Sequence, residues 1–305
     1  MIARRLVAVV GPTATGKSAI ALELARRFGG AIVNADSRQI YRGMDIGTAK
    51  PDLATRTVVP HYLYDIADPT TGFSLGVYLE HARRALQHTW DAASTPWLVG
   101  GTGQYVWALL EAWTVPEVPP DNELRTTLAA EAESAGPQTL HDRLAGIDPV
   151  AAARIDVANV RRVIRAIEVH HHTGRPISDW QKKGNPGFDT LILGVDLPDA
   201  ELDARIAARV QAMYDAGFVE EVRLLQAGGL PGDAPAMSAI GYQEAARALR
   251  GELPVAAAIE ETIVATKRLV RRQRQWFRKS DARIHWGRSS DDFTALVEEF
   301  FGGCN

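Results

Sequence analysis

The sequence predicts an α/β fold in which a parallel sheet is flanked by helices, with an all-helical insertion. Short valine-rich apolar runs alternate with segments whose apolar residues have helical spacing, which is typical of β-α-β units. Near Val115 this alternation stops, and no strand-like run returns until about residue 190. We therefore expect a core formed by residues 1–114 and 190–305, interrupted by a helical domain of residues 115–189.

The first half of the core alternates between predicted strands and helices. RLVAVV (residues 5–10) is an apolar run that Gly11 stops, as expected for a buried parallel strand. SAIALELARRF then has helical spacing and ends at two glycines. AIVNAD predicts a second strand ending in a carboxylate, residues 76–93 predict a helix, and PWLVGGTGQY predicts a strand running into a glycine turn. Ligands of such sheets bind at the carboxyl ends of the strands.

The insertion and the second half of the core follow in the same way. The proline-rich, acidic VPEVPPDNELR opens the insertion, and KKGNPGFDT closes it. Between them lie four helical stretches, ELRTTLAAEAESAG, TLHDRLAGI, PVAAARI and NVRRVIRAIEVHHHTG. LILGVDL (residues 191–197) restores the strand pattern, and two further helices, ELDARIAARVQAMYDAG and FVEEVRLLQAGG, come after it.

Composition excludes several classes of protein. The 305 residues are 46% hydrophobic and 23% charged, which is typical of a globular protein with a core. The formal net charge of −3 argues against an overall basic nucleic-acid binder but is compatible with a local basic face. The single cysteine, Cys304, cannot form an intrachain disulfide, and the N-terminal apolar run is too short for a signal peptide or a membrane span. We expect a cytoplasmic monomer that does not associate with membranes.

The residues after the first strand have the spacing of a phosphate-binding loop. GPTATGKS fits the pattern G-x-x-x-x-G-K-[ST] between a strand and a helix. Glycines let backbone N–H groups turn toward phosphate oxygens, and the helix N-terminus adds a favourable dipole. Lys17 would neutralise phosphate charge, and the Ser18 hydroxyl would bind Mg²⁺. The expected phosphate-binding residues are Gly11, Pro12, Thr13, Ala14, Thr15, Gly16, Lys17 and Ser18.

Asp36 lies just past the second predicted strand and should therefore face the same site. A carboxylate there could bind Mg²⁺, as in kinases, or take a proton from an acceptor substrate. A helix cap at the start of a turn with Ser37 is the structural alternative. The phosphate loop alone favours an ATP-using phosphotransferase.

Several motifs together resemble one family. GPTATGKS, NADSRQIYRGMDIGTAKP, PHYLYDI, GGTGQY, AIGYQE and TKRLVRRQRQWFRK resemble the tRNA dimethylallyltransferases, also called tRNA isopentenyltransferases, from about residue 8 to residue 286. The resemblance implies a core similar to small P-loop kinases and an insertion that binds the tRNA anticodon arm. It also implies transfer of a dimethylallyl group from dimethylallyl diphosphate to N6 of adenosine 37, in tRNAs reading codons that begin with U. The loop would then hold a diphosphate that departs.

The resemblance also implies roles for individual residues. Asp36 would be the general base, Thr102 would lie near the reacting adenosine, and Lys17 with Mg²⁺ on Ser18 would stabilise the departing diphosphate. Arg223, in EEVRLL, is a further candidate for reaching the diphosphate. The residues expected to contact tRNA are Asp36, Ser37, Arg38, Gln39, Thr102, Arg125, Arg161, Arg162, Val163, Ile164 and Arg165.

Two basic stretches bear on RNA binding. Arginines neutralise phosphates and stack on unpaired bases, but Arg165 and Glu168 also have the spacing of a helical ion pair, so a solvated helix face is the alternative. A second run from Lys267 to Lys279 contains no acid and interleaves two aromatic residues, which predicts an RNA backbone track on a helix. The tract of residues 170–172, three consecutive histidines, predicts a helix surface rather than a metal site, because neighbouring helical residues point in different directions.

Departures from the family pattern and three rival functions stay open. Gln104 replaces a usually hydrophobic residue, and Ser238 stands where a larger polar or basic residue is common, so both could alter tRNA contacts. The rivals are a small-molecule kinase with the insertion as a lid, an adenylate dimethylallyltransferase making a free cytokinin, and a non-catalytic RNA-binding protein. The arginines of the insertion favour polymeric RNA over AMP as the acceptor. The sequence does not indicate which residues line the allyl group.

Overall fold

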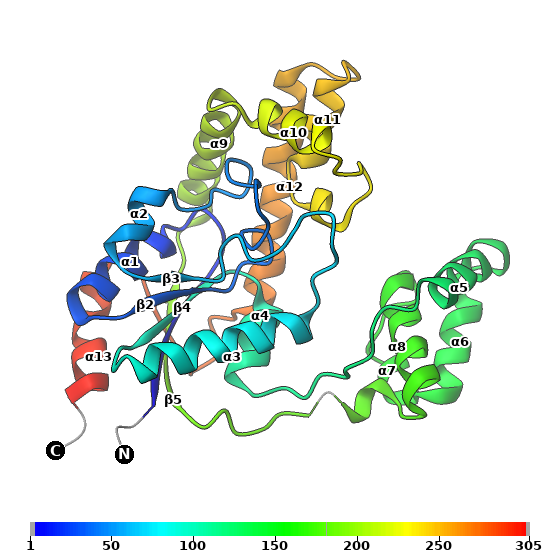
Figure 1. The fold of residues 1–305 in the computed structure, drawn as a ribbon, viewed down its shortest axis with the longest axis horizontal. Helices are drawn as coiled ribbons and strands as arrows, with labels where there is room; N and C mark the ends of the chain where they lie inside the picture. Colours follow the sequence, from blue (N-terminus) through cyan, green and yellow to red (C-terminus); the bar gives the residue numbers. More distant parts are fainter. Residues whose placement is uncertain (1–3, 181, 303–305) are drawn as a thin grey trace. The chain divides into compact units, whose positions relative to one another are not determined.

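The chain folds into two compact units, a core of Met1–Leu110 with Gly187–Asn305 and an insertion of Glu111–Pro186 (Figure 1). The computed structural model describes residues 4–180 and 182–302, so Cys304 lies outside the described residues. Within these ranges, no helix is long and apolar enough to cross a membrane.

The described part of the core contains one six-stranded sheet, in which all neighbouring strands are parallel. Its strands are β1 (Arg5–Val10), β2 (Ala31–Asn34), β3 (His61–Tyr62), β4 (Pro96–Gly100), β5 (Asp189–Val195) and β6 (Ile284–Gly287), in the order β3-β2-β4-β1-β5-β6. The chain moves from β1 outward to β2 and β3, and returns to place β4 beside β1. This reversal of direction next to β1 is the kind of switch point at which parallel sheets bind ligands.

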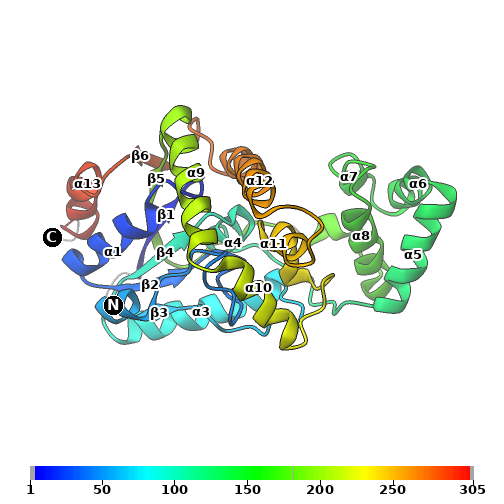
Figure 2. The ribbon, with the colours of Figure 1, turned by 90° about the horizontal axis from the view of Figure 1, so that it is seen from above.

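Helices cover both faces of the sheet, which explains its apolar strands (Figure 2). The helices of the core are α1 (Lys17–Phe28), α2 (Leu53–Val58), α3 (Leu75–Asp91), α4 (Gly103–Leu110), α9 (Asp199–Asp215), α10 (Phe218–Ala227), α11 (Tyr242–Leu249), α12 (Val255–Trp276) and α13 (Asp291–Gly302). On one face α1 and α13 pack against Val7, Val9 and Leu193. Leu6 and Ala8 alternate with these residues and so face the other side, where α3 and α4 contact the sheet.

A second apolar cluster joins helices α9 to α12 to the loop after β2. Ile40 and Met44 of that loop are buried against Phe218, Val222 and Tyr242 from α10 and α11. The long helix α12 also contacts α9, α11 and α4. The loop that follows the second strand is therefore held between the sheet and these helices.

In the described residues of the insertion, all regular secondary structure is helical. It comprises α5 (Asn122–Ala135), α6 (Pro137–Ile147), α7 (Pro149–Ala152) and α8 (Val160–Thr173), with a short 3-10 turn at Ile177–Asp179. Its apolar core includes Leu128, Leu140, Leu144, Val163 and Ile167.

The boundaries of the insertion fall a few residues before those expected at 114/115 and 189/190. The carbonyl of Glu111 accepts a hydrogen bond from the N–H of Gly184 at 2.9 Å, and the Glu111 carboxylate pairs with Lys183 at 2.9 Å. These contacts join the segment that enters the insertion to the segment that leaves it. Asp189 is already part of β5, paired with Arg5 of β1. The predicted strand at residues 191–197 therefore begins and ends two residues early.

Candidate active site

A cavity of about 510 Å³ opens at the carboxyl ends of β1, β2 and β4. The segment after each of these strands contributes to its lining, and α9 and α12 supply the opposite wall. The lining includes half of the residues that the sequence selected, namely Thr13, Ala14, Gly16, Lys17, Ser18, Asp36, Ser37, Arg38, Gln39 and Thr102. Motifs far apart in the chain therefore meet at one site.

The phosphate loop divides into residues that line the cavity and residues that shape the loop. A Cβ atom on Gly11, whose φ is +139°, would lie 2.1 Å from the carbonyl oxygen of Val195, so a side chain cannot fit there. The carbonyl of Pro12 accepts hydrogen bonds from the Thr15 hydroxyl at 3.0 Å and from the Lys17 ammonium at 3.1 Å. Gly11, Pro12 and Thr15 do not line the cavity and help to shape the loop, and the prediction that they bind phosphate directly stays a prediction.

Of the charged groups that line the cavity, Lys17, Arg209 and Asp36 act on one another. Desolvation lowers the pKa of Lys17 to about 8, the Asp36 carboxylate opposes this shift, and the Arg209 guanidinium adds to it. Desolvation also lowers the pKa of Arg209, again opposed by Asp36. The Arg209 guanidinium donates to the hydroxyl of Thr13 at 3.3 Å, which places it at the phosphate loop. This charge pattern suits a polyanion between Lys17 and Arg209.

Arg209 was missed by sequence reasoning, and Arg223 was selected wrongly. Arg223 lies on the exposed side of α10, where Glu220 accepts two hydrogen bonds of 2.7 Å from its guanidinium, and it does not line the cavity. Arg209 lies on the face of α9 that also buries Ile206 and Val210. A charged residue within the apolar stripe of a helix was the signal that could have identified it.

Asp36 and Thr102 lie next to each other because β2 and β4 are neighbours. The backbone N–H of Ser37 donates to the Thr102 hydroxyl at 3.0 Å, and the N–H of Thr102 donates to the carbonyl of Ala35 at 3.2 Å. One oxygen of Asp36 accepts the N–H of Arg38 at 2.8 Å, and the backbone N–H of Asp36 donates to Asn34 at 3.0 Å. The carboxylate is thus fixed in orientation while it faces the cavity.

Arg38 and Gln39 present oriented polar groups to the same cavity. The Arg38 guanidinium donates to the carbonyl of Pro235 and to the hydroxyl of Ser238, each at 3.0 Å. The Gln39 amide nitrogen donates to the carbonyls of Thr48 at 3.0 Å and Ala49 at 3.1 Å. Because both amide hydrogens are used, Gln39 offers its oxygen as an acceptor. Both departures from the family pattern, Gln104 and Ser238, line this cavity as well.

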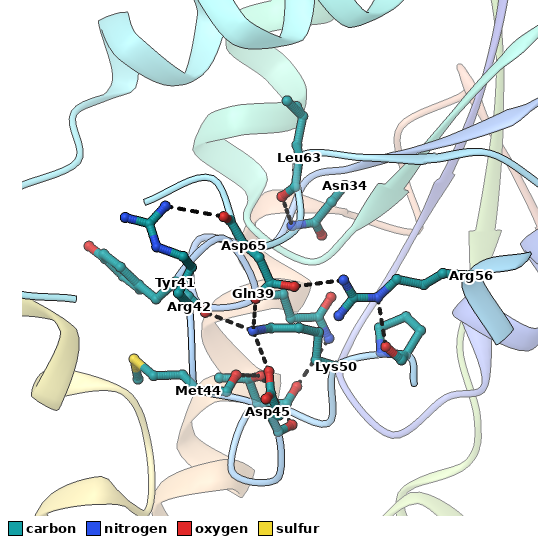
Figure 3. A network of polar contacts seen from close by, with 12 residues as sticks. Asn34, Gln39, Tyr41, Arg42, Met44, Asp45, Lys50, Arg56, Leu63 and Asp65 are labelled. Carbon is teal, nitrogen blue, oxygen red and sulfur yellow. Dashed lines mark hydrogen bonds and ion pairs between the residues drawn. The ribbon is translucent and has the colours of Figure 1, made fainter. Parts of the chain in front are cut away.

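A buried ion network fixes the loop that carries these residues (Figure 3). The Lys50 side chain is 0% exposed, and its ammonium donates to the carbonyl of Tyr41 at 2.7 Å and to Asp45 and Asp65 at 2.6 Å each. Arg56 also pairs with Asp65 at 2.6 Å. The loop after β2 is therefore bound to the segment after β3, and this keeps the backbone carbonyls that orient Gln39 in place.

Glu221 of α10 anchors the same loop from the other side. Its carboxylate accepts the backbone N–H groups of Asp45 at 2.9 Å, Ile46 at 2.6 Å and Gly47 at 3.2 Å. It also accepts the hydroxyl of Tyr242 at 2.7 Å. Three consecutive N–H groups thus converge on one buried carboxylate.

Helix α12 connects the two glycine loops of the cavity. The side chain of Gln273 accepts the N–H of Thr13 at 2.8 Å and donates to the carbonyl of Gly101 at 3.0 Å. Trp276, which is 41% exposed, and Arg272 line the cavity one turn apart. Side chains from α12 therefore border both the phosphate loop and the open part of the site.

The basic run of α12 is less free than its sequence indicates. Lys267 pairs with Asp203 at 2.8 Å, Arg274 pairs with Asp196 at 2.9 Å, and Lys279 pairs with Asp196 at 3.5 Å. Phe277 is buried, so Trp276 alone of the two aromatic residues is exposed. Among the described residues, Arg268, Arg271 and Arg272 have no acidic partner. An RNA track along this helix would consist of these three arginines and Trp276.

The arginines of the insertion also divide into two kinds. Glu168 is buried and accepts hydrogen bonds of 2.7 and 2.8 Å from Arg125, and it also pairs with Arg165. Arg161 and Arg162 are exposed and have no acidic partner in the described part of the chain.

The prediction that Val163 and Ile164 contact tRNA is wrong for their side chains. Both residues are packed in the core of the insertion, because they lie on the apolar face of α8.

Among the described residues, no group of three His, Cys, Asp or Glu side chains could hold a metal ion.

Comparison with known protein families identifies the family to which this chain belongs. The profile of the IPP transferase family matches residues 39–280, and that of isopentenyl transferases matches residues 4–58. The chain belongs to the IPP transferase family. The two profiles together span every residue that lines the cavity of this family member.

Individual members of the IPP transferase family match along nearly the whole chain. A tRNA dimethylallyltransferase from Chloroflexus aggregans is 46% identical over 292 residues, which cover 96% of this chain and 99% of that protein. The solved tRNA isopentenylpyrophosphate transferase from Bacillus halodurans is 36% identical, with a TM-score of 0.70 and coverage of 98% of this chain and 96% of that chain. A eukaryotic dimethylallyltransferase acting on tRNA, at 23% identity and a TM-score of 0.84, shares the fold over 98% of this chain and 80% of its own.

Proposed function

We propose that the protein transfers a dimethylallyl group from dimethylallyl diphosphate to N6 of adenosine 37 in tRNAs reading codons that begin with U. The products are N6-dimethylallyladenosine and diphosphate. The observation that carries the proposal is one cavity with two cations, Lys17 and Arg209, beside the oriented carboxylate of Asp36. The names of the family members that match over nine tenths or more of the chain support it.

The cationic part of the cavity would hold the departing diphosphate. Lys17, Arg209 and the N–H groups at the start of α1 would stabilise negative charge that grows on the leaving oxygens as the allylic C–O bond breaks. Ser18 lines the cavity, and Mg²⁺ bound to phosphates keeps most of its ligands as water and phosphate oxygens, so a single protein hydroxyl fits such an ion. Bound there, Mg²⁺ would neutralise part of the diphosphate charge.

Asp36 would take the proton of the attacking amine. The exocyclic N6 of adenine is a weak nucleophile whose lone pair is delocalised into the ring, so a base is needed as the new C–N bond forms. One oxygen of Asp36 accepts the N–H of Arg38, and among the described residues no donor binds its other oxygen. That oxygen is available for the proton, and the neighbouring Thr102 hydroxyl would contact the adenosine.

The acceptor base must leave its stack to enter this cavity. The exposed indole of Trp276 offers a surface on which an unpaired base can stack, and Arg272 and Arg38 supply positive charge in the lining. In the insertion, the exposed Arg161 and Arg162 are the side chains we propose for the anticodon arm. We propose that the protein acts as a monomer in the cytoplasm.

The decisive test is transfer of radiolabelled dimethylallyl groups to an unmodified tRNA that carries A36-A37-A38. We expect label on this tRNA and none on an A37→G tRNA. Asp36→Asn should lower the rate by at least ~10²-fold, because a general base is removed. Label on AMP alone would instead indicate the cytokinin enzyme, and release of the γ-phosphate of ATP to a small acceptor would indicate a kinase.

A further inference from the structure

A second cavity, of about 870 Å³ and open to the surface, adjoins the active-site cavity. It is lined by the loop before α2, by α2 itself and by the C-terminal half of α9. Three residues line both cavities: Ala49, Arg209 and Met213. These three residues therefore form the partition between the two spaces.

The partition lies where the hydrocarbon part of the substrate would reach. Arg209 and Met213 are one helical turn apart on α9, so they are neighbours on the same face. Ile206 and Val210 also line the active-site cavity from α9. If Arg209 holds the diphosphate, this apolar stretch of α9 is the nearest wall for the allyl group, which the sequence did not indicate.

Of the three residues in the partition, one can be shortened. Arg209 is needed for the diphosphate, and the side chain of Ala49 is a single methyl group. Met213 is long, unbranched and only partly buried, and it lines both cavities. We propose that Met213 limits the transferred group to five carbons by closing the active-site cavity against the second cavity. This inference rests on the function proposed above.

A longer donor would undergo the same chemistry if it fitted. In geranyl diphosphate the C1–O bond would break with its electron pair leaving on diphosphate, N6 would form the C1–N bond, and the N6 proton would pass to Asp36. The step needs no further reactant. The second cavity lies within the range of volumes that hold small-molecule ligands, so it can take the extra five-carbon unit once Met213 is removed.

The test compares geranyl and dimethylallyl transfer by the full-length Met213→Ala protein. We expect the ratio of kcat/KM for geranyl diphosphate to that for dimethylallyl diphosphate to rise at least ~10-fold above the wild-type ratio, as expected when several methylene groups gain room. Gln211→Ala is the control on the same helix, because Gln211 is exposed and lines neither cavity. Its ratio should stay near that of the wild type.

A blocking variant locates the extra carbons. Ala212 lines only the second cavity, so Ala212→Trp should leave dimethylallyl transfer unchanged and should abolish geranyl transfer in the Met213→Ala background. If Met213→Ala does not fold, Met213→Val provides the same comparison with a smaller cavity.

Two results would overturn the role of Met213. One is a folded variant that transfers dimethylallyl groups with an unchanged ratio, and the other is a wild type that uses both donors equally well. A wild type that transfers no dimethylallyl group to tRNA would instead refute the proposed function, so the two failures are distinguishable.

Discussion

Lys17 and Arg209 in the core, and Arg125 and Arg165 in the insertion, are two pairs of partly buried cations with different partners. The insertion pair shares the buried carboxylate of Glu168 through charged hydrogen bonds. Among the described residues, the core pair forms no ion pair, and Asp36 is the carboxylate that acts on both. Because a partly desolvated charge without a close partner is costly, such a group marks a place where a ligand supplies the missing charge.

The largest effect is expected when each of the two arginines considered for the diphosphate, Arg209 and Arg223, is replaced by alanine. Arg209→Ala should lower kcat/KM for dimethylallyl diphosphate by about 10²–10³-fold, because a fixed donor to the leaving group is lost. Arg223→Ala removes an exposed ion pair with Glu220 and should change the same constant by less than about twofold. Steady-state kinetics with saturating tRNA give both values, and equal effects of the two substitutions would contradict the placement of the diphosphate.

In the insertion, the corresponding substitution should affect folding. Glu168→Gln leaves two arginines without their carboxylate, and both are partly solvated, so we expect a loss of about 2–3 kcal/mol of unfolding free energy. Denaturant titration measures it, and hydrogen exchange should locate the loss in α5 and α8. Arg161→Ala is the control, since this exposed residue should change tRNA affinity but not stability.

A pH titration gives the smallest effect and the most specific one. The pKa of Lys17 is about 8 in the free site, and a bound diphosphate requires the charged form. Below pH 8 the ammonium is charged and binding is at full strength; above pH 8 it loses its proton, so the KM for dimethylallyl diphosphate should rise about fivefold between pH 8 and pH 9. Lys17→Arg should remove this dependence, and a flat profile for the wild type would show that Lys17 is not the titrating group.

How much of the site could be predicted from sequence depends on how local each signal is. The phosphate loop, Asp36 and Thr102 each follow a strand directly, so the rules for parallel sheets bring them together. Arg209 was missed because it lies on α9, 196 residues beyond Thr13, the residue of the phosphate loop that it contacts. The partners of Lys267 and Arg274 lie 64 and 78 residues away in the chain, and a run without acids gave no sign of them.

The fold shows the same limit. Long periodic segments such as α3, α9 and α8 were predicted within a few residues, because the helical spacing of their apolar residues indicates the face that is buried. PWLVGGTGQY was predicted as a strand running into a glycine turn, and β4 does end at Gly100, but the helix α4 that begins at Gly103 was not predicted. The two-residue β3 and the short β6 have too few residues for a pattern and are stabilised by their neighbours.

The carboxylate of Glu221 has a consequence for where a substrate phosphate can bind. Three successive backbone N–H groups pointing to one place form the kind of concavity that attracts phosphates. Here the protein fills that concavity with an anion of its own. A diphosphate at this end of the sheet therefore cannot bind in that concavity, because the Glu221 carboxylate occupies it and does not dissociate. The phosphate loop is then the site that remains for the diphosphate.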